Sequence, residues 1–450
     1  MNERSDRVTT DGPVRVGLLG CGNVGGALVE LLGERASAVA ADAGLVLEVA
    51  GIAVRSTTKD RGLSVDPELL TTDAAALVDD PTVDVVVELI GGIEPARTLV
   101  LQALKQGKPV VTGNKELLAN HGGELYAAAE AAGVDLLFES SAAGAIPIIR
   151  PLRESLLGED IRSIMGIVNG TTNYILTRMT EEGVDYGEVL AEAQRLGYAE
   201  RDPTADVEGY DAGAKAAIMA SIAFGANVVA GDVYHEGIAD ITADDIEFAR
   251  RFDYTIKLLA IAERHDGDGG QEIGVRVYPA MVPDSHPLAS VRGSFNAVFV
   301  DGGAAGELMF YGRGAGGMPT ASAVLGDLID AATNLRRGTF RPVPSGPRAT
   351  IRPIDDLETA YYVGLTVGDH PGVLSKVAGV FGRHDVSILA MQQEMSDPST
   401  GAPSDDAGGE TAKVAFITHV ACERNIQATV SELRHLDEVT DIHSLLRVIG

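Results

Sequence analysis

Residues 14–25 read VRVGLLGCGNVG, and this stretch decides the fold of the first third of the chain. Val14–Leu19 is an apolar run of the kind found in strands that are buried on both faces of a parallel sheet. Similar runs return after helical patterns, and we predict further strands at residues 45–54, 83–90, 109–112 and 135–139. Strands that alternate with helices predict an α/β fold with a doubly wound, Rossmann-like sheet.

A glycine-rich loop with the spacing G-x-G-x-x-G follows the first strand. Its first glycine permits a tight turn, the second lets the backbone approach a pyrophosphate, and the third lets helix and strand pack closely. The motif has the context that it needs, because a strand precedes it and an apolar helical pattern follows it. The residues that we expect at a dinucleotide cofactor are Gly20, Gly22, Asn23, Val24 and Gly25.

The end of the second strand bears on the choice of cofactor. NAD-selective folds usually carry Asp or Glu at this place, where it binds the ribose 2′-hydroxyl. Here the sequence offers Arg55 and Lys59 with three hydroxyl residues between them. Cations and hydroxyls suit a 2′-phosphate, although an ordinary solvated loop has the same composition. The sequence therefore favours NADP, with NAD as the alternative.

Two more loops follow strands of the same predicted sheet. Gly91 comes after the strand at 83–90, and Lys115 comes shortly after the strand at 109–112. The carboxyl ends of the strands line the cofactor crevice in a doubly wound sheet. We therefore expect both residues near the cofactor, with Lys115 close to the nicotinamide.

Residues 197–215, GYAERDPTADVEGYDAGAK, combine five acidic residues with a single lysine. Asp211 and Lys215 are four residues apart where a helical pattern begins, so they can share one face. Lysine is scarce, with eight in the chain against 28 arginines, and an amine can lose its proton on burial whereas a guanidinium cannot. The pattern fits an acid/base lysine among carboxylates that hold an ammonium substrate; an exposed acidic loop is the alternative.

Length and composition limit the other classes of function. A chain of 450 residues with 45% hydrophobic residues predicts about three domains with sizeable cores. A net charge of −29 argues against binding to nucleic acid. We find no secretory segment and no apolar run that could span a membrane, so we expect a cytoplasmic protein. Cys21 and Cys422 lie far apart and indicate neither a disulfide framework nor a metal cluster.

Taken together, these motifs resemble those of homoserine dehydrogenases, which interconvert aspartate 4-semialdehyde and homoserine in threonine, methionine and isoleucine biosynthesis. The resemblance covers roughly residues 14–335 and rests on the glycine loop and residues 114–115, 139–147, 169–174, 197–215 and 312–316. It implies that Lys215 donates and accepts the proton, and that Lys115 lies beside substrate and nicotinamide. It also implies substrate contacts by Glu200, Asp206 and Asp211, and a cofactor contact by Gly316.

The same resemblance implies a site for a monovalent cation such as Na⁺. Its ligands would be Glu139 and the backbone carbonyls of Ala142, Gly144 and Ile146. The segment departs from the family pattern by being rich in alanine, which carbonyl ligands tolerate. No cluster of His and Cys in the sequence suggests a catalytic zinc site.

The last 90 residues follow a separate pattern, β-α-β-β-α-β, which is typical of a ferredoxin-like unit. They resemble an ACT domain whose ligand loop contains Asp369, His370 and Gly372. Domains of this kind bind amino acids, often at a dimer interface, which suggests threonine as effector and a homodimer or homotetramer. A dimerisation module without a ligand is the alternative. An acidic insertion at 396–410 is expected to be mobile.

We therefore expect five segments in order: a disordered N-terminus at 1–12, an NAD(P)-binding domain at 13–150 with a return helix at 319–335, an α+β catalytic and dimerisation domain at 151–318, a linker at 336–358, and the ACT domain at 359–450. Two other functions remain open. One is a different Rossmann-fold reductase of an amino-acid semialdehyde or oxo acid, and the other is an NADP-sensing ACT regulator without catalysis. Aspartate-semialdehyde dehydrogenase would need a catalytic cysteine outside the phosphate loop, and neither cysteine qualifies.

Overall fold

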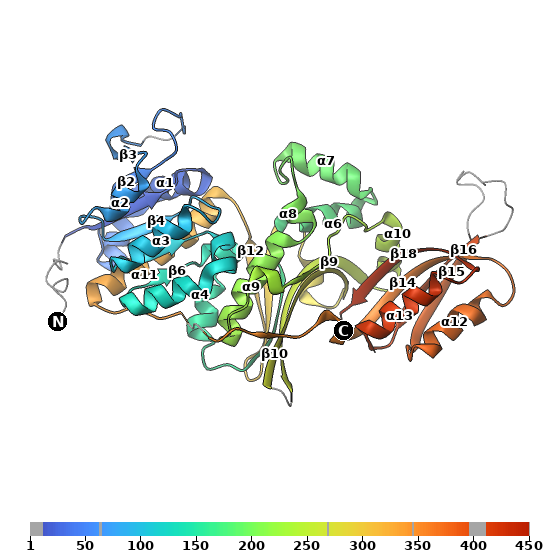
Figure 1. The fold of residues 1–450 in the computed structure, drawn as a ribbon. Helices are drawn as coiled ribbons and strands as arrows, with labels where there is room; N and C mark the ends of the chain where they lie inside the picture. The colour runs from blue at the N-terminus through green and yellow to red at the C-terminus, as the bar shows by residue number, and fades with distance from the viewer. Residues whose placement is uncertain (1–11, 63–64, 268–269, 344–345, 396–410, 450) are drawn as a thin grey trace.

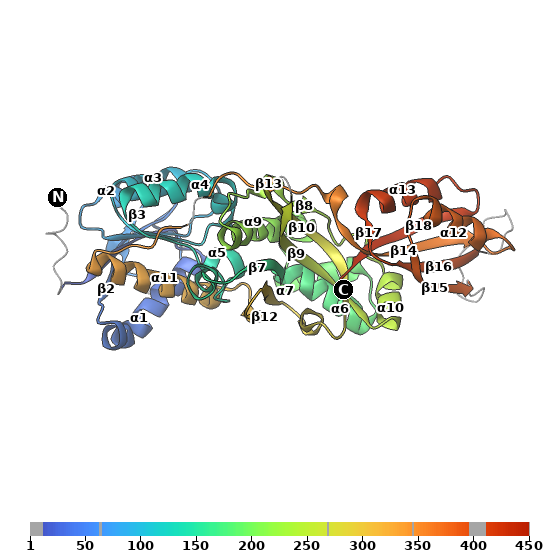
Figure 2. The same cartoon turned by 90° about the horizontal axis from the view of Figure 1, so that it is seen from below.

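The computed structural model describes residues 12–62, 65–267, 270–343, 346–395 and 411–449. Three parts lie in a row, with the Rossmann-like part at one end and the C-terminal part at the other (Figure 1). Figure 2 shows the same row from below. The predicted disorder of the first residues and the predicted mobility of 396–410 concern residues 1–11 and 396–410, which lie outside the described ranges.

The first part is built on a six-stranded sheet with the order β3-β2-β1-β4-β5-β6, in which every pair of neighbours is parallel. Its strands are β1 (Val14–Leu19), β2 (Leu47–Ala53), β3 (Leu70–Thr71), β4 (Val85–Glu88), β5 (Val110–Thr112) and β6 (Leu136–Leu137). The short β3 was not predicted, and the other five fall inside the predicted segments. The strand order reverses between β1 and β4, which is where doubly wound sheets bind their ligands. The Rossmann-like fold class is thus confirmed.

Helices cover both faces of this sheet. One face carries α1 (Asn23–Ala43) and α11 (Gly317–Arg337), and the other carries α2 (Ala74–Asp79), α3 (Ala96–Lys105) and α4 (Lys115–Ala132). Side chains alternate along a strand. Val85 and Val87 therefore belong to the hydrophobic cluster that includes α1 and α11, whereas Val86 belongs to the cluster that includes α2, α3 and α4. The helix α11 returns from far along the chain to complete this layer, in agreement with the prediction for residues 319–335 (Figure 1).

The remaining strands form one continuous sheet with the order β12-β11-β7-β9-β10-β18-β14-β16-β15. The strands of the middle part are β7 (Ile161–Ile167), β9 (Tyr254–Gly267), β10 (Gly270–Pro283), β11 (Phe295–Gly302) and β12 (Gly306–Arg313). The 14-residue strand β9 was not predicted, because its apolar run fits a strand and a helix equally well. The middle and C-terminal parts join where β10 pairs in parallel with β18 (Val439–Val448).

Three helices pack on one face of the middle sheet: α6 (Gly170–Glu182), α9 (Tyr210–Phe224) and α10 (Ala243–Arg251). The helix α9 lies between this sheet and helices α4 and α5 (Ser140–Ala143), so it is buried along most of its length. The short α5 forms the first part of the alanine-rich segment to which the resemblance assigns a cation. α9 is preceded by α7 (Tyr186–Leu196) and α8 (Thr204–Val207), and is followed by the short strand β8 (Tyr234–His235).

The C-terminal part is ferredoxin-like, as predicted. Its strands β14 (Glu358–Gly368), β15 (Ile388–Met395), β16 (Thr411–Thr418) and β18 pair in the order β18-β14-β16-β15, and α12 (Val373–Arg383) and α13 (Glu423–Leu433) cover one face. On the other face Phe248 of α10 stacks on Tyr362, with ring centroids 4.6 Å apart. The predicted linker is packed rather than free, since β13 (Thr350–Ile351) pairs with β10. None of the helices in the described ranges is long and apolar enough to span a membrane.

Candidate active site

The glycine loop has the close contacts that its sequence requires. Gly20 has a positive φ of 100°, and a Cβ there would lie 2.6 Å from the Leu89 carbonyl oxygen. A Cβ at Gly25 would lie 2.3 Å from the carbonyl oxygen of Gly20. Gly22 faces open space at the start of α1, and no side chain caps that helix, so its first N–H groups are available to an anion.

The loops after β4 and β5 are fixed by a buried carboxylate that the sequence reasoning did not single out. Glu88 accepts hydrogen bonds from the backbone N–H of Ile90 at 2.8 Å and of Gly91 at 3.2 Å. Its other oxygen accepts a bond of 2.6 Å from the Thr112 hydroxyl. Asn114 donates to the Gly92 carbonyl at 2.7 Å and caps α4 through the N–H of Leu117. An acidic residue inside an apolar strand was the signal that could have identified Glu88.

The second strand ends in an exposed, cationic loop. Arg55 and Lys59 are both exposed beyond the end of β2, as predicted from the sequence. Arg61 organises this loop by donating to the backbone carbonyls of Ser56, at 2.5 Å, and Lys59, at 2.8 Å. Arg61 is a third cation that our sequence reasoning did not consider. Burial raises the pKa of the nearby Cys21 thiol, which argues against a nucleophilic role for it.

Two lysines from different domains share one carboxylate. Asp211, on the first turn of α9, pairs through one oxygen with Lys215 at 2.7 Å and through the other with Lys115 at 2.5 Å. Lys215 lies one helical turn further along α9, as the four-residue spacing predicted, and also donates to the Val168 carbonyl at 2.6 Å. Lys115 comes from the start of α4, so the cluster joins the Rossmann-like part to the middle part.

The Asn169 side chain is hydrogen-bonded to two carboxylates at this cluster. Its amide nitrogen donates to Asp206 at 2.7 Å and to Asp211 at 2.9 Å. Its amide oxygen accepts from the backbone N–H of Thr172 at 2.9 Å, which caps α6. The segment at residues 169–172 is therefore the start of helix α6, and its first residue joins that helix to the acidic side chains.

The electrostatics of the cluster differ between its two amines. Burial lowers the pKa of Lys215, and the nearby charge of Lys115 lowers it further, although Asp211 opposes both effects. Lys115 keeps 46% of its side chain exposed, and although burial lowers its pKa, the charge of Asp211 outweighs burial and raises it. Burial raises the pKa of Asp211, but the charges of Lys215 and Lys115 outweigh burial and lower it. Lys215 therefore loses its proton more readily than an ordinary lysine, whereas Lys115 holds its proton more tightly.

Not every predicted substrate residue enters the cluster. Burial raises the pKa of Asp206, which lies against Asn169. Glu200 is exposed, and within the described ranges no hydrogen bond joins its carboxylate to Asp211 or to the lysines. Its role at the substrate stays a prediction.

Comparisons with known proteins agree with this geometry. A model of the NAD-binding domain of homoserine dehydrogenase matches residues 20–139, a homoserine dehydrogenase model matches residues 147–329, and an ACT domain model matches residues 361–438. The homoserine dehydrogenase of Mycobacterium tuberculosis is 51% identical over 97% of this chain and 98% of its own length. That of Corynebacterium glutamicum is 51% identical over 97% and 95%. A crystal structure of a homoserine dehydrogenase from Thiobacillus denitrificans superposes with a TM-score of 0.89 at 41% identity, covering 98% of this chain and 99% of that one.

The chain belongs to the homoserine dehydrogenase family.

It is thus an NAD(P)-dependent oxidoreductase that acts on a CH–OH group and carries an ACT domain. This family membership replaces the two alternatives that the sequence left open. They were a different semialdehyde or oxo-acid reductase and a non-catalytic regulator. The match covers nearly the full length of each of these three relatives.

The segment that a homoserine dehydrogenase would use for a cation is anchored by Glu139. Its carboxylate accepts three backbone N–H bonds, from Ile148 at 2.5 Å and from Ile149 and Arg150 at 2.8 Å. Gly144, with a φ of 62°, lies against the backbone of Gly314, where a Cβ would meet the carbonyl oxygen at 2.2 Å. This contact places the segment beside a second glycine-rich turn, at residues 312–316, which leads into α11.

The second glycine-rich turn also reaches the cofactor loop. Gly316 has a φ of 124° and precedes α11, and a Cβ at Gly317 would lie 3.1 Å from the carbonyl oxygen of Asn23. Gly20 meanwhile lies against the backbone of Leu89, which leads into Gly91. The structure therefore brings together three of the loops that the sequence assigned to the cofactor.

The ACT ligand loop is the remaining predicted site. Gly372 has a φ of 98° and precedes α12, so the helix begins directly at this loop. His370 is exposed, and Asp369 accepts a weak hydrogen bond of 3.4 Å from Gln393 of β15. The helix α12, at whose start this loop lies, is far from α9 along the row of domains (Figure 1).

Proposed function

We propose that Lys215 is the acid/base group of a reversible reduction of L-aspartate 4-semialdehyde to L-homoserine, with NADPH as the preferred cofactor. The single observation that carries this proposal is the Lys115–Asp211–Lys215 cluster, in which Asp211 and Lys215 are buried and which lies beyond the end of β5 on the cofactor side of the sheet. When bound, NADPH would supply the hydride at the carbonyl carbon of the aldehyde.

The chain's own residues would manage the proton and the charge. In reduction, the Lys215 ammonium gives a proton to the oxygen that becomes the homoserine hydroxyl, and the pKa lowered by burial favours this transfer. In oxidation, neutral Lys215 takes the hydroxyl proton. Lys115 keeps its charge and stabilises the negative charge that develops on the same oxygen.

The carboxylates would recognise the amino end of the substrate. Asp206 and Asp211 lie within hydrogen-bond reach of Asn169 and present anionic oxygens on one side of the cluster. We propose that they bind the substrate together with Glu200, which would approach from the exposed loop after α7. A four-carbon amino aldehyde places an ammonium and a carbonyl at the two ends of such a site.

The test of this assignment is Lys215→Ala. We expect turnover of L-homoserine, followed by nicotinamide absorbance, to be lost while NADPH still binds in a fluorescence titration. Loss of NADPH binding and of turnover to the same extent would indicate a misfolded protein and would remove the support for a catalytic role.

The preference for NADPH rests on Arg55 and Lys59, with Arg61 holding their loop. A phosphate on the ribose would meet cations there rather than a carboxylate partner. A hyperthermophilic archaeal homoserine dehydrogenase that is 29% identical was crystallised in complex with NADPH. Arg55→Asp should move the ratio of kcat/KM from NADPH toward NADH, with Arg35→Asp on exposed α1 as the control for added negative charge. An unchanged ratio would remove Arg55 from the cofactor site.

A monovalent cation such as Na⁺ fits the segment that Glu139 anchors. The carbonyl oxygens of Gly144 and Ile146 accept no hydrogen bond from the described residues, and we propose them as ligands together with Ala142 and Glu139. Next to this segment, the Asn296 amide is 1% exposed and forms no hydrogen bond within the described ranges, although its nitrogen lies near Gly314. A bound cation would supply a fixed positive charge beside the cofactor loops. Its binding should appear as a rise in melting temperature when Na⁺ replaces a bulky organic cation at equal ionic strength.

We further propose that the ACT domain binds threonine through Asp369, His370 and Gly372. The loop at the start of α12 leaves helix N–H groups available to a carboxylate. His370→Ala in the full-length chain should weaken inhibition by threonine without changing the uninhibited rate. A wild-type enzyme that is indifferent to threonine would favour the alternative, a dimerisation module without a ligand.

We also propose a homodimer or homotetramer assembled in part through the ACT domain. The strand β15 is at the edge of the sheet and exposes 58% of Leu389 and 45% of Met391, a pattern typical of a covered edge. Light scattering on the purified chain gives the mass, and Leu389→Lys should lower it if this edge is an interface.

A further inference from the structure

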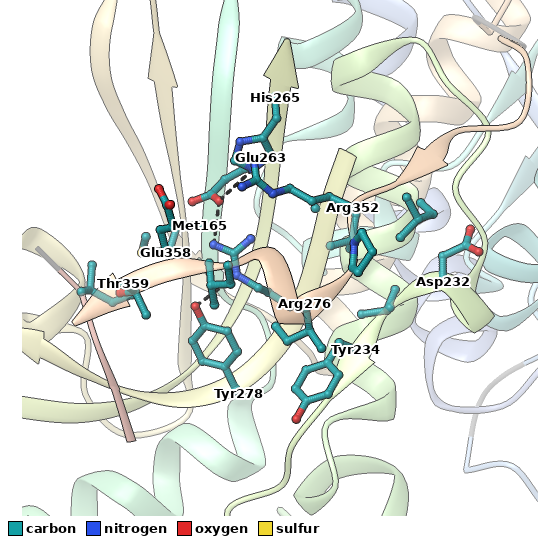
Figure 3. Close-up of a pocket in the computed structure, with 18 residues that line it drawn as sticks. Met165, Asp232, Tyr234, Glu263, His265, Arg276, Tyr278, Arg352, Glu358 and Thr359 are labelled. Carbon is teal, nitrogen blue, oxygen red and sulfur yellow. Dashed lines mark hydrogen bonds and ion pairs between the residues drawn. The ribbon is translucent and has the colours of Figure 1, made fainter. Parts of the chain in front are cut away.

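A cavity of about 530 Å³ lies where the linker crosses the middle sheet, away from the cofactor and substrate residues. Its floor comes from β9 and β10, and its other walls come from residues 351–354 and the start of β14 (Figure 3). Glu263, Arg276 and Tyr278 line it from the sheet face that is turned away from α9. A volume of this size is within the range of about 300–1,000 Å³ that small-molecule sites have.

The floor of this junction cavity holds a neutralised charge pair. Arg276, 6% exposed, pairs with Glu263 at 2.7 Å and donates to the Tyr278 hydroxyl at 3.1 Å. Burial raises the pKa of Glu263, but the contacts with His265 and Arg276 outweigh it and lower that pKa to about 2. The pair therefore stays ionised at neutral pH and adds no net charge to the cavity.

Two further charges in the same cavity have no such partner. Arg352 donates to the backbone carbonyl of Asp356 at 2.8 Å, and within the described ranges neither Arg352 nor Glu358 forms an ion pair. In Figure 3 the Arg352 side chain extends into the cavity toward His265. Asp232, at the rim, is already paired with Arg348. One guanidinium and one carboxylate are thus available to a ligand.

Apolar residues also line the cavity. Val275, Ile354 and Leu357 line the cavity and belong to, or pack against, the two hydrophobic clusters of the sheet. A ligand that matches this lining carries one negative charge, one positive charge and an apolar group. We propose that the junction cavity binds an apolar α-amino acid as a zwitterion, with its carboxylate at Arg352 and its ammonium at Glu358. This site is separate from the Asp211 cluster and from the loop at Asp369, and does not depend on the function proposed for either.

Occupancy of the cavity has a structural connection to α9. Tyr234 lines the cavity, and its hydroxyl donates to Glu236 at 2.5 Å. The residue between them, His235, packs on Gly213 of α9, where a Cβ would lie 2.0 Å from the imidazole. Gly213 stands two residues from Asp211 and two from Lys215. A ligand that shifts β8 would therefore change the position of the catalytic helix.

The experiment is calorimetric titration of the full-length protein with L-leucine, L-isoleucine and L-phenylalanine. At least one of them should bind with a Kd of about 1 mM or tighter. Two analogues of leucine then test the two charges: 4-methylpentanoate lacks the ammonium, and 3-methylbutylamine lacks the carboxylate. Each should bind about 10-fold or more weakly than leucine, because each leaves one charged group of the cavity without a partner.

Three variants locate the site. Arg352→Gln should weaken binding about 10-fold or more, and Ile354→Trp should abolish it by filling the cavity. Arg162→Gln, on an exposed position of β7, makes the same change of charge outside the cavity and should bind normally, as should His370→Ala in the ACT loop. No binding by any of the three amino acids below roughly 10 mM would overturn the proposal. Binding that survives both cavity variants, or that is equally tight for 4-methylpentanoate and leucine, would do the same.

Discussion

Two charge clusters of this protein have a buried central residue and are built with opposite signs. In the first, Asp211 lies between the cations Lys115 and Lys215. In the second, the cation Arg447 lies between the anions Glu236 and Glu423, at 2.7 and 2.8 Å. Both clusters join neighbouring domains, since Lys115 belongs to the Rossmann-like part and Arg447 to the ACT domain. They differ in the chemistry of the cation.

The two cations differ in whether the folded protein lowers or raises their pKa. Burial lowers the pKa of Lys215, so this amine can exchange a proton. Burial also lowers the pKa of Arg447, but its bonds to Glu236 and Glu423 outweigh burial and raise it. The Arg447 guanidinium is stacked over Tyr278, 4.5 Å from the ring centroid, and Glu423 also accepts a bond from Tyr361 at 2.8 Å. A lysine occupies the position where we propose that a proton moves, and an arginine occupies the position where the positive charge is kept.

The largest effect should come from placing an arginine, the cation of the Arg447 cluster, at the position of Lys215. Lys215→Arg keeps the positive charge beside Asp211 but provides a group that cannot release its proton at accessible pH. We expect kcat to fall about 10³-fold or more, because general acid/base catalysis is lost. Steady-state rates with L-homoserine measure this loss, and NADPH titration shows whether the cofactor site is intact.

Lys257→Arg is the matched control. Lys257 is also buried, at 2% exposure, and binds the Asn173 side chain and the Val291 carbonyl rather than Asp211. It should lower the melting temperature and keep most of kcat. An active Lys215→Arg enzyme would show that the proton comes from another group.

The reverse exchange, Arg447→Lys, should act on stability. A lysine cannot bind both oxygens of Glu423 and reach Glu236, so one of the two carboxylates loses its cationic partner. We expect a loss of about 2–4 kcal/mol in the free energy of unfolding. Denaturant unfolding gives the value, and Arg424→Lys, an exposed pair with Asp356, should change it by less than about 0.5 kcal/mol. Equal values for the two variants would show that the Arg447 cluster adds little.

The pH dependence of homoserine oxidation provides a smaller test of the catalytic cluster. Oxidation requires neutral Lys215, so its rate rises as pH passes through the Lys215 pKa, which is below the usual value of 10.5. Asp211 raises that pKa, so Asp211→Asn should lower it and move the rising limb of the kcat profile toward lower pH by roughly one unit. A shift toward higher pH, or none, would show that Asp211 does not act on the catalytic amine.

The smallest effect should come from Glu200, which lies outside both clusters. Because Glu200 is exposed, Glu200→Gln should leave the melting temperature unchanged. If the carboxylate binds the substrate ammonium, KM for homoserine rises by roughly three- to tenfold with little change in kcat. A KM equal to that of the wild type would place Glu200 outside the substrate site.

Features that depend on short stretches of sequence could be predicted well. The strand at Val14–Leu19 has the predicted bounds, and its glycine loop has the contacts that its glycines suggest. Asp211 and Lys215 share a helix face because their spacing equals one helical turn. In contrast, β9 was not predicted, since a run of apolar residues does not distinguish a strand from a buried helix.

Features that depend on distant segments could not be predicted. The acidic residue in an apolar strand marks Glu88 as unusual, but nothing local indicates which loops it bonds to, or that the linker would pack on β10 to close a cavity. The same holds for the pairing of β10 with β18, which makes two domains share one sheet. Such contacts depend on how the helices and strands pack against one another, and the spacing of apolar residues along the chain does not specify that packing.

The sequence by itself determined the Rossmann-like fold, the ACT domain and the choice of lysine at position 215, because each depends on residue types at fixed short spacings. Only the tertiary structure distinguishes the amine that we propose as the proton donor from the other one. It places Lys115 of one domain and Lys215 of another on the same carboxylate, and it buries Lys215 while leaving Lys115 partly exposed. Burial and the charge of a neighbour set a pKa, and both are properties of the folded molecule rather than of the chain.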